Sequence, residues 1–257
     1  METLKHYFVG HGPKIPIIFE NQFNLHIGDP SKNIHNYTND SSFKNISKLN
    51  SRFCELTGLY WIWKNSTIND EEYISFNHYR RWFDPKSINK IISQNQLNQI
   101  DFILPNVYKV PYSLEKQFNI NHIPESWNYV YSVLNNNLDD TFLRKPEDFF
   151  QKTNVLFPYN MFVTNKKMLN ELCSWLFKIL FELNDQINYD SLLTQHRFIG
   201  FISERLMTYY FLNKKDIKHK ECYVNGKNPR KRVNQIISNQ ISNSCFHLLW
   251  KNNLVNT

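Results

Sequence analysis

The stretch YISFNHYRRWF, residues 73–83, joins an apolar strand pattern to a dense group of cationic side chains. Tyrosine, isoleucine and phenylalanine dominate its first half, which is typical of a buried strand. His78, Arg80 and Arg81 then follow within four residues, among aromatic neighbours. In open α/β sheets ligands bind beyond the carboxyl ends of the strands, and guanidinium groups grip phosphate oxygens through paired hydrogen bonds. The stretch therefore predicts an anion site at a strand end. A solvated basic turn with ordinary salt bridges is the alternative.

The segments on either side of this stretch predict alternating strands and helices. KHYFVGH (residues 5–11) and DFILPN (101–106) are typical of strands, and IPIIF (15–19) of a further short extended piece. Helical spacing of apolar residues predicts helices over 50–65, 88–99, 112–137 with a break near Pro124, 166–187 and 195–213. This alternation favours an α/β or α+β domain.

Two consecutive segments after the first strand have contrasting patterns. Residues 21–50 are rich in Asn, Ser and Asp, which predicts a long loop or a loop with short helices, and long ordered loops often bind ligands. NSRFCELTGLYWIWKN, residues 50–65, predicts one helix of about four turns with Asn50 or Ser51 as its N-cap. Its wide aromatic stripe indicates a mainly structural role in the core, since such stripes are usually buried.

Composition limits the class of protein and of partner. The 257 residues suffice for one large domain with a sizeable core. An aromatic content of 16% argues against a disordered chain, and only six glycines argue against a glycine-rich phosphate loop. The formal net charge of +7 favours anionic partners such as nucleotides, nucleic acid or an acidic membrane face, without choosing among them.

Cysteine spacing and the apolar segments bear on metal binding and localisation. The four cysteines lie far apart and form no CxxC pair, which argues against a zinc ribbon: Cys54, Cys173, Cys222 and Cys245. The first 12 residues are too short and polar for a signal peptide. The most apolar window, residues 172–183, carries two charges and is too short to span a bilayer. We expect a cytoplasmic protein.

Carboxylates are needed for proton transfer or metal binding in a transferase or hydrolase. The candidates are Asp29, Asp40, Asp101 and Glu204. No DxD triplet occurs, so metal-assisted diphosphate binding has little support in the sequence. Glu204 adjoins Arg205 on an amphipathic helix, where a structural ion pair is the alternative. His122 and His196, each taken alone, fit ordinary polar roles better than ligand roles.

Several long blocks are similar to a known family and occur in its order. They are YFVGHG (7–12), NIS (45–47), CELTGLYWIWKN (54–65), YISFNHYRRWF (73–83), PYNMFVTNKKMLNELCSWLFKILFEL (158–183) and RFIGFISERL (197–206). Together they resemble the bacterial family DUF4422, whose members lie in capsule and O-antigen gene clusters as glycosyltransferases. The resemblance covers most of the chain, from Tyr7 to about Leu206.

The resemblance implies a fold, a domain organisation and an activity. It implies a GT-A-like α/β fold, with a Rossmann-like nucleotide-binding half and a helical C-terminal part. Residues 1–257 would form a single glycosyltransferase domain, with the nucleotide-sugar half at about 1–110 and the acceptor or helical half at about 111–257. The implied reaction moves a sugar, often galactose as pyranose or furanose in this family, from a UDP-linked donor to a surface-polysaccharide or lipid-linked acceptor.

The resemblance also implies roles for individual residues. The donor-binding residues would be Gly10, His11, His78, Tyr79, Arg80 and Arg81. The acceptor-binding residues would be Tyr112, Asn160 and Arg197, with Asn160 belonging to the NMF element of residues 160–162. The catalytic residues would be Glu204 as first candidate base, Asp40 as second, and His122. Where the family has an acidic residue after the position of His122, this chain has HIPESW, with Glu125 nearby.

Comparison with other GT-A enzymes suggests how the leaving group is stabilised. In most of them a DxD motif holds a divalent metal, whereas HYRR occupies a comparable strand end here. We therefore expect Arg80, Arg81 and His78 to stabilise the diphosphate as fixed cations, without a metal cofactor. Dependence on Mn²⁺ or Mg²⁺ is the alternative.

Two further expectations concern partners. The basic run Lys227–Arg232 predicts peripheral contact with the inner membrane face that carries a lipid-linked acceptor, with a solvated tail as the alternative. A nucleic-acid-binding module would also fit the positive charge, but the basic residues are dispersed and carry no known binding motif. We expect no nucleic-acid partner. A phosphate-ester hydrolase lacks a metal cluster or obvious nucleophile in this sequence.

Overall fold

A computed structural model of the chain describes residues 4–12, 15–33, 35, 37–69, 72–94, 97–122, 126–187 and 196–226. Four features discussed above lie outside the described residues: Pro124, Glu125, the basic run 227–232 and Cys245.

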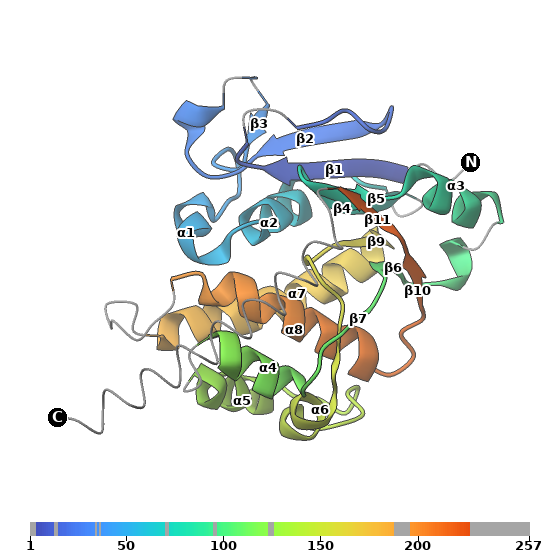
Figure 1. The fold of residues 1–257 in the computed structure, drawn as a ribbon. Helices are drawn as coiled ribbons and strands as arrows, with labels where there is room; N and C mark the ends of the chain where they lie inside the picture. The colour runs from blue at the N-terminus through green and yellow to red at the C-terminus, as the bar shows by residue number, and fades with distance from the viewer. Residues whose placement is uncertain are drawn as a thin grey trace.

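A twisted sheet forms the centre of the fold (Figure 1). Its strands follow the order β10-β6-β9-β4-β1-β2-β3. Their bounds are β1 (Leu4–Gly10), β2 (Gln22–His26), β3 (Thr38–Asn39), β4 (Tyr73–His78), β6 (Phe102–Pro105), β9 (Phe162–Asn165) and β10 (His219–Cys222). β5 (Arg81–Phe83) pairs with β4 and with β11 (Val224–Gly226), while β7 (Tyr108–Lys109) and β8 (Val155–Leu156) form a separate pair.

The direction of β9 determines which turns meet at one edge of the sheet. β1 is parallel to both β2 and β4, whereas β9 runs antiparallel between β4 and β6. Phe76 of β4 pairs with Phe162 of β9. Residues that follow β4 therefore lie at the same edge as the residues that precede β9.

Helices cover both faces of the sheet, and most of them lie on the face that α2, α7 and α8 cover (Figure 1). Their bounds are α1 (Asn50–Phe53), α2 (Leu56–Asn65), α3 (Pro85–Ser93), α4 (Leu114–Asn121), α5 (Ser126–Asn136), α6 (Pro146–Lys152), α7 (Lys166–Gln186) and α8 (Phe198–Asn213). Short 3₁₀ turns span Pro30–Lys32, Ser47–Leu49 and Leu97–Gln99. Figure 1 shows α7 and α8 between the sheet and the group α4–α6.

Strand alternation explains the two hydrophobic clusters. Val9, Ile74 and Phe76 point toward α2, α7 and α8 and belong to the larger cluster. Tyr73 and Val163 point the other way and pack with the apolar residues of α3. This is the two-residue period of a sheet covered on both faces.

The α/β prediction is confirmed, with specific differences near the N-terminus. The expected strands at 5–11, 73–83 and 101–106 and the helices at 166–187 and 195–213 are present within a few residues. The prediction of an extended piece at 15–19 was wrong. The second strand, β2, lies at 22–26, inside the polar stretch that was predicted to be a loop. Pairing of β2 along β1 outweighs the low strand propensity of its Gln and Asn residues.

The helix expected over 50–65 is broken into α1 and α2. Cys54, between them, has a left-handed backbone with φ 53°, and the predicted N-cap at Asn50 or Ser51 was wrong because Leu49 takes that position without a side-chain cap. Instead the Asn50 side chain donates to the Cys54 carbonyl and the Thr57 hydroxyl, both at 3.0 Å. The break creates a corner that carries Cys54 and Glu55.

A buried histidine in β1 makes stability depend on pH. The His6 ring lies flat on Phe19, with centroids 3.6 Å apart, and its Nδ1 is 2.7 Å from Ser75 Oγ. Burial lowers the pKa of His6 from 6.5 to about 4. Between these values the unfolded chain binds more protons than the folded one, so the free energy of unfolding decreases as the pH falls from 6.5 to 4.

We expect this loss to reach about 3 kcal/mol at pH 4. Urea unfolding at pH 7 and at pH 4.5 measures it, and His6→Gln should flatten the dependence. The exposed His35→Gln serves as the control and should keep it. An unchanged pH dependence in His6→Gln would show that another group is responsible.

Candidate functional site

The ends of β1 and β4 are interlocked by one aromatic ring. The Tyr79 amide donates to the Val9 carbonyl at 2.9 Å, and the Tyr79 ring lies against Gly10 and Gly12. A Cβ atom at Gly10 would stand 2.6 Å from this ring, and one at Gly12 would stand 2.7 Å from it. Both positions therefore require glycine, and this contact fixes the HYRR turn on the loop after β1.

The two arginines of the turn are held in different ways. The guanidinium carbon of Arg81 lies 4.5 Å from the centroid of the Tyr159 ring, and that of Arg80 lies 4.9 Å from the Tyr79 ring. β11 closes the turn from its other side, where Gly226 pairs with Arg81. Gly226 has φ 131° and a Cβ there would lie 2.1 Å from the Arg80 carbonyl oxygen, so only glycine fits.

Glu55 lies at the α1–α2 corner and faces this cationic group. Its Oε1 accepts a hydrogen bond of 2.9 Å from Asn160 Nδ2. Burial raises the pKa of Glu55, although the bond from Asn160 and the nearby Arg197 and Arg81 act in the opposite direction. We call His11, Glu55, Arg80, Arg81, Asn160 and Arg197 the edge cluster.

His11 connects the remaining members of the edge cluster. Burial lowers its pKa, and the charges of Arg80, Arg197 and His26 lower it further, while Glu55 acts in the opposite direction. The imidazole is therefore neutral at neutral pH, so one ring nitrogen can donate a hydrogen bond and the other can accept one. The edge cluster contains three arginines and one carboxylate, so positive charges outnumber negative ones.

The turn that carries Asn160 is held in an unfavourable backbone conformation. Tyr159 and Asn160 have φ values of 78° and 54°, a region that non-glycine residues adopt at a cost and mostly where surrounding contacts impose it. Glu204 Oε1 accepts from the Tyr159 amide at 2.8 Å, and Ser203 Oγ donates to Asn160 Oδ1 at 3.1 Å. With its oxygen occupied, the Asn160 amide group presents its nitrogen to Glu55.

Helix α8 begins against the Cys54–Glu55 corner. Arg197, its N-cap residue, donates from Nε to Cys54 Sγ at 3.1 Å. A Cβ at Gly200 would lie 2.9 Å from the same sulfur. The close approach of α8 thus brings Arg197 beside Glu55.

The structure brings together five residues predicted from the sequence: His11, Arg80, Arg81, Asn160 and Arg197. Gly10 and Tyr79 shape the loops beneath them. His78 is the last residue of β4, directly before the turn. Glu204 lies behind the cluster, bound to the backbone of Tyr159.

Asp40 lies beneath the cluster rather than in it. It is 0% exposed and accepts from Thr57 Oγ1 at 2.5 Å and from the Gly28 amide at 3.2 Å. Burial raises its pKa, while these two bonds and the charge of His26 lower it. These contacts tie the loop after β2 to helix α2.

The two predicted residues of the helical layer lie farther from Glu55. The His122 ring stacks on Phe201 at 4.6 Å, and the Arg197 guanidinium lies 5.5 Å from that same ring. His122 is therefore one aromatic ring away from the edge cluster. Tyr112 is exposed, and its ring lies 4.6 Å from Lys116 Nζ.

The other candidate carboxylates have structural contacts. Asp29 caps the 3₁₀ turn at Pro30–Lys32, and Asp101 accepts from the Lys218 amide at 2.7 Å. Among the described residues, no group of three His, Cys, Asp or Glu side chains is placed to hold a metal ion. In the same part of the chain, no helix is both long and apolar enough to cross a bilayer.

Glu55 was missed from the sequence because the helical spacing of residues 50–65 indicated core packing. The available signal was a carboxylate and a cysteine within an otherwise apolar stripe. Only the break at Cys54, which depends on the Asn50 side chain, turns this residue toward the arginines.

Comparison with known protein families identifies the family of this chain. The sequence pattern of the family described as a domain of unknown function, DUF4422, matches residues 11–215. The chain belongs to the DUF4422 family. No curated protein matches its sequence significantly.

The DUF4422 chain is also similar to a solved structure, the apo form of WbbM, described as a bifunctional glycosyltransferase. The TM-score is 0.72 and the sequence identity 25% over 88% of this chain. The match covers 46% of the WbbM chain, so this DUF4422 chain spans about half of that protein's length. The expected GT-A-like fold is confirmed by this likeness.

Proposed function

We propose that this DUF4422 chain is a glycosyltransferase that moves a hexose from a nucleotide sugar to a saccharide acceptor. The observation that carries the proposal is the edge cluster at the carboxyl ends of β1 and β4, in which the charges of Arg81 and Arg197 act on the Glu55 carboxylate and those of Arg80 and Arg197 act on His11. Family membership and the likeness to WbbM support the same class of reaction. We further propose a UDP-linked donor, galactose as the sugar, and an acceptor belonging to a capsule or O-antigen polysaccharide or its lipid-linked precursor.

We assign the diphosphate of the donor to Arg80 and Arg81. Both follow β4 at the edge where α/β sheets bind nucleotides, and Tyr79 and β11 fix the backbone that carries them. When the bond between the anomeric carbon and the diphosphate breaks, negative charge grows on the diphosphate. Cations already in place stabilise that charge without reorganisation. Dialysis against EDTA tests whether a divalent ion assists.

We assign proton transfer to Glu55 in preference to Glu204 and Asp40. In this scheme the acceptor oxygen attacks the anomeric carbon while its proton passes to the Glu55 carboxylate. The raised pKa of Glu55 suits a general base working near neutral pH. Glu55 accepts one side-chain hydrogen bond, from Asn160. Glu204 accepts the Tyr159 amide with one oxygen and lies 3.9 Å from Arg205 with the other, and Asp40 is 0% exposed with both oxygens bonded.

The donor prediction is tested by thermal unfolding with UDP-, GDP-, CMP- and dTDP-sugars. A ligand at 100 times its Kd stabilises the folded state by about 2.7 kcal/mol, since it binds only that state. We expect the melting temperature to rise with a UDP-sugar and not with the others. Arg80→Gln should abolish this rise. If none of the four nucleotide sugars raised the melting temperature of the wild-type chain, the proposed function would be overturned.

We also propose that the protein makes peripheral contact with an anionic membrane surface. It rests on the basic run 227–232, which lies outside the described residues. Binding to anionic vesicles, compared with a variant that has acidic residues in this run, tests it.

A further inference from the structure

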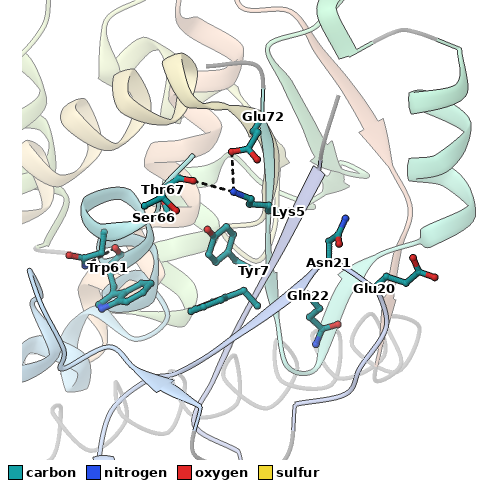
Figure 2. Close-up of a pocket in the computed structure, with 11 residues that line it drawn as sticks. Lys5, Tyr7, Glu20, Asn21, Gln22, Trp61, Ser66, Thr67 and Glu72 are labelled. Carbon is teal, nitrogen blue, oxygen red and sulfur yellow. Dashed lines mark hydrogen bonds and ion pairs between the residues drawn. The ribbon is translucent and has the colours of Figure 1, made fainter. Parts of the chain in front are cut away.

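Figure 2 shows a cavity of about 500 Å³. It lies at the amino end of β1, whereas the edge cluster lies at the carboxyl end of the same strand. The cavity is formed by the amino ends of β1 and β2, by the end of α2 and by the residue before β4. Lys5, Tyr7, Asn21, Phe23, Trp61 and Glu72 are among the residues that line it. A volume of this size is typical of small-molecule sites.

The charges of the cavity argue against a phosphate or nucleotide ligand. Among the described residues that line it, Lys5 is the one cation. Lys5 Nζ bonds Glu72 Oε2 at 3.0 Å and the Thr67 carbonyl at 3.1 Å, as Figure 2 shows. Glu20 adds a further negative charge at the exposed rim. The cavity is therefore neutral to acidic, in contrast to the arginine-rich edge cluster.

Aromatic rings supply the apolar part of the cavity. Phe23 stacks on Trp61 with centroids 5.9 Å apart and an interplanar angle of 17°, and it contacts Tyr7 at 5.4 Å. Phe23 is 36% exposed, whereas Trp61 is 5% exposed. The Trp61 indole N–H is already engaged by the Ser42 carbonyl at 3.0 Å, so the ring contributes surface rather than a donor.

Exposed polar groups lie beside these rings. The side chains of Glu20 and Asn21 are exposed at the turn before β2, and Figure 2 shows them on the side of the cavity away from Trp61. A carboxylate accepts hydrogen bonds, and an amide both donates and accepts them. Aromatic surface next to such groups matches a neutral sugar, which has apolar C–H faces and a rim of hydroxyl groups.

We propose that this cavity is a saccharide-binding subsite that holds sugar units of the acceptor at a distance from the reacting hydroxyl. The acceptor part of this proposal rests on the proposed function. The seven residues of β1 separate the cavity from the edge cluster by roughly 20 Å. The subsite would therefore engage acceptors that are several sugar units long, and not the sugar that reacts.

Saturation-transfer NMR with the full chain tests the subsite directly. The probes are four neutral disaccharides: lactose, melibiose, cellobiose and maltose. We expect transfer from the protein to at least one of them, with binding roughly threefold to tenfold weaker in Phe23→Ala because a stacked ring is lost. Asn21→Ala, at an exposed position, should weaken binding as well and guards against misfolding of the first variant.

Phe43→Ala is the matched control. Phe43 is also exposed and also contacts Trp61, at 6.5 Å, but it does not line the cavity. Its substitution should leave disaccharide binding unchanged, and added UDP should not displace the sugar. The subsite proposal would be overturned if none of the four probes showed transfer, or if both cavity variants bound the sugar as well as the wild type does. Displacement of the sugar by UDP would also overturn it. Disaccharide binding without any nucleotide-sugar binding would instead contradict the proposed function and leave the subsite standing.

Discussion

Glu55→Gln lowers the turnover of sugar transfer by about 10² to 10⁴-fold, the usual contribution of a positioned general base. The substitution keeps the shape of the side chain and an oxygen for the bond from Asn160, but it removes the basic group. Donor binding should change little, because the arginines remain. Turnover and thermal shift with the nucleotide sugar, measured on the same preparation, separate the two effects.

Glu204→Gln is the matched control for this experiment. Its amide oxygen can still accept from the Tyr159 amide, so the turn before β9 is preserved. We expect near-normal turnover, within about tenfold, since no reacting proton would be transferred there. The opposite pattern, with Glu204→Gln inactive and Glu55→Gln active, would return the base to Glu204.

The pH dependence gives an independent readout of Glu55. A base works only when deprotonated, so kcat/KM falls as the pH drops through its pKa, which burial raises above the usual 4.5. Asn160→Ala removes a hydrogen bond that lowers this pKa. We expect the acidic limb of its profile to move to higher pH, a change that loss of stability alone would not produce.

Arg80→Gln and Arg81→Gln each lower kcat/KM by roughly 30- to 1000-fold, which corresponds to about 2–4 kcal/mol of transition-state stabilisation. The reason is the loss of a fixed cation beside the leaving diphosphate. Arg81→Lys should recover little, because a lysine cannot make paired hydrogen bonds or stack as a plane on Tyr159. Steady-state kinetics with a UDP-sugar measures these effects.

Lys90→Gln on α3 controls for the change in net charge, since Lys90 is exposed and remote from the turn. Dialysis against EDTA completes the experiment. Retained activity is expected if the arginines act alone. Activity that is lost and then restored by Mn²⁺ or Mg²⁺ would contradict the metal-independent scheme.

The sequence predicted those parts of the fold that have a strong local pattern. The apolar strands β1, β4 and β6 and the long helix α7 follow directly from residue type and spacing. β2 was missed because its polar residues become a strand only by pairing with β1. β10 and β11 were missed for the same reason, as both depend on partners more than a hundred residues earlier.

The site was predictable in part. The HYRR turn and His11 follow strands that are visible in the sequence, and the family resemblance indicated Asn160 and Arg197. The contact between Glu55 and Asn160 joins residues 105 positions apart, and the orientation of Glu55 depends on a break that helical spacing does not reveal. Long-range packing therefore sets the chemistry that local patterns leave undetermined.

The position of β9 has a consequence for the order of folding. Along the chain, only the short β5, α3 and a 3₁₀ turn separate β4 from β6, yet β9, synthesised some sixty residues after β6, must insert between them. Such non-local pairing is slow, because long loops must close before any contact compensates their lost entropy. A nascent chain that ends before β9 can form the β1–β4 pairing but lacks the turn that orients Glu55. Catalytic competence should therefore be among the last properties the chain acquires, and a pulse-refolding assay should detect secondary structure well before activity.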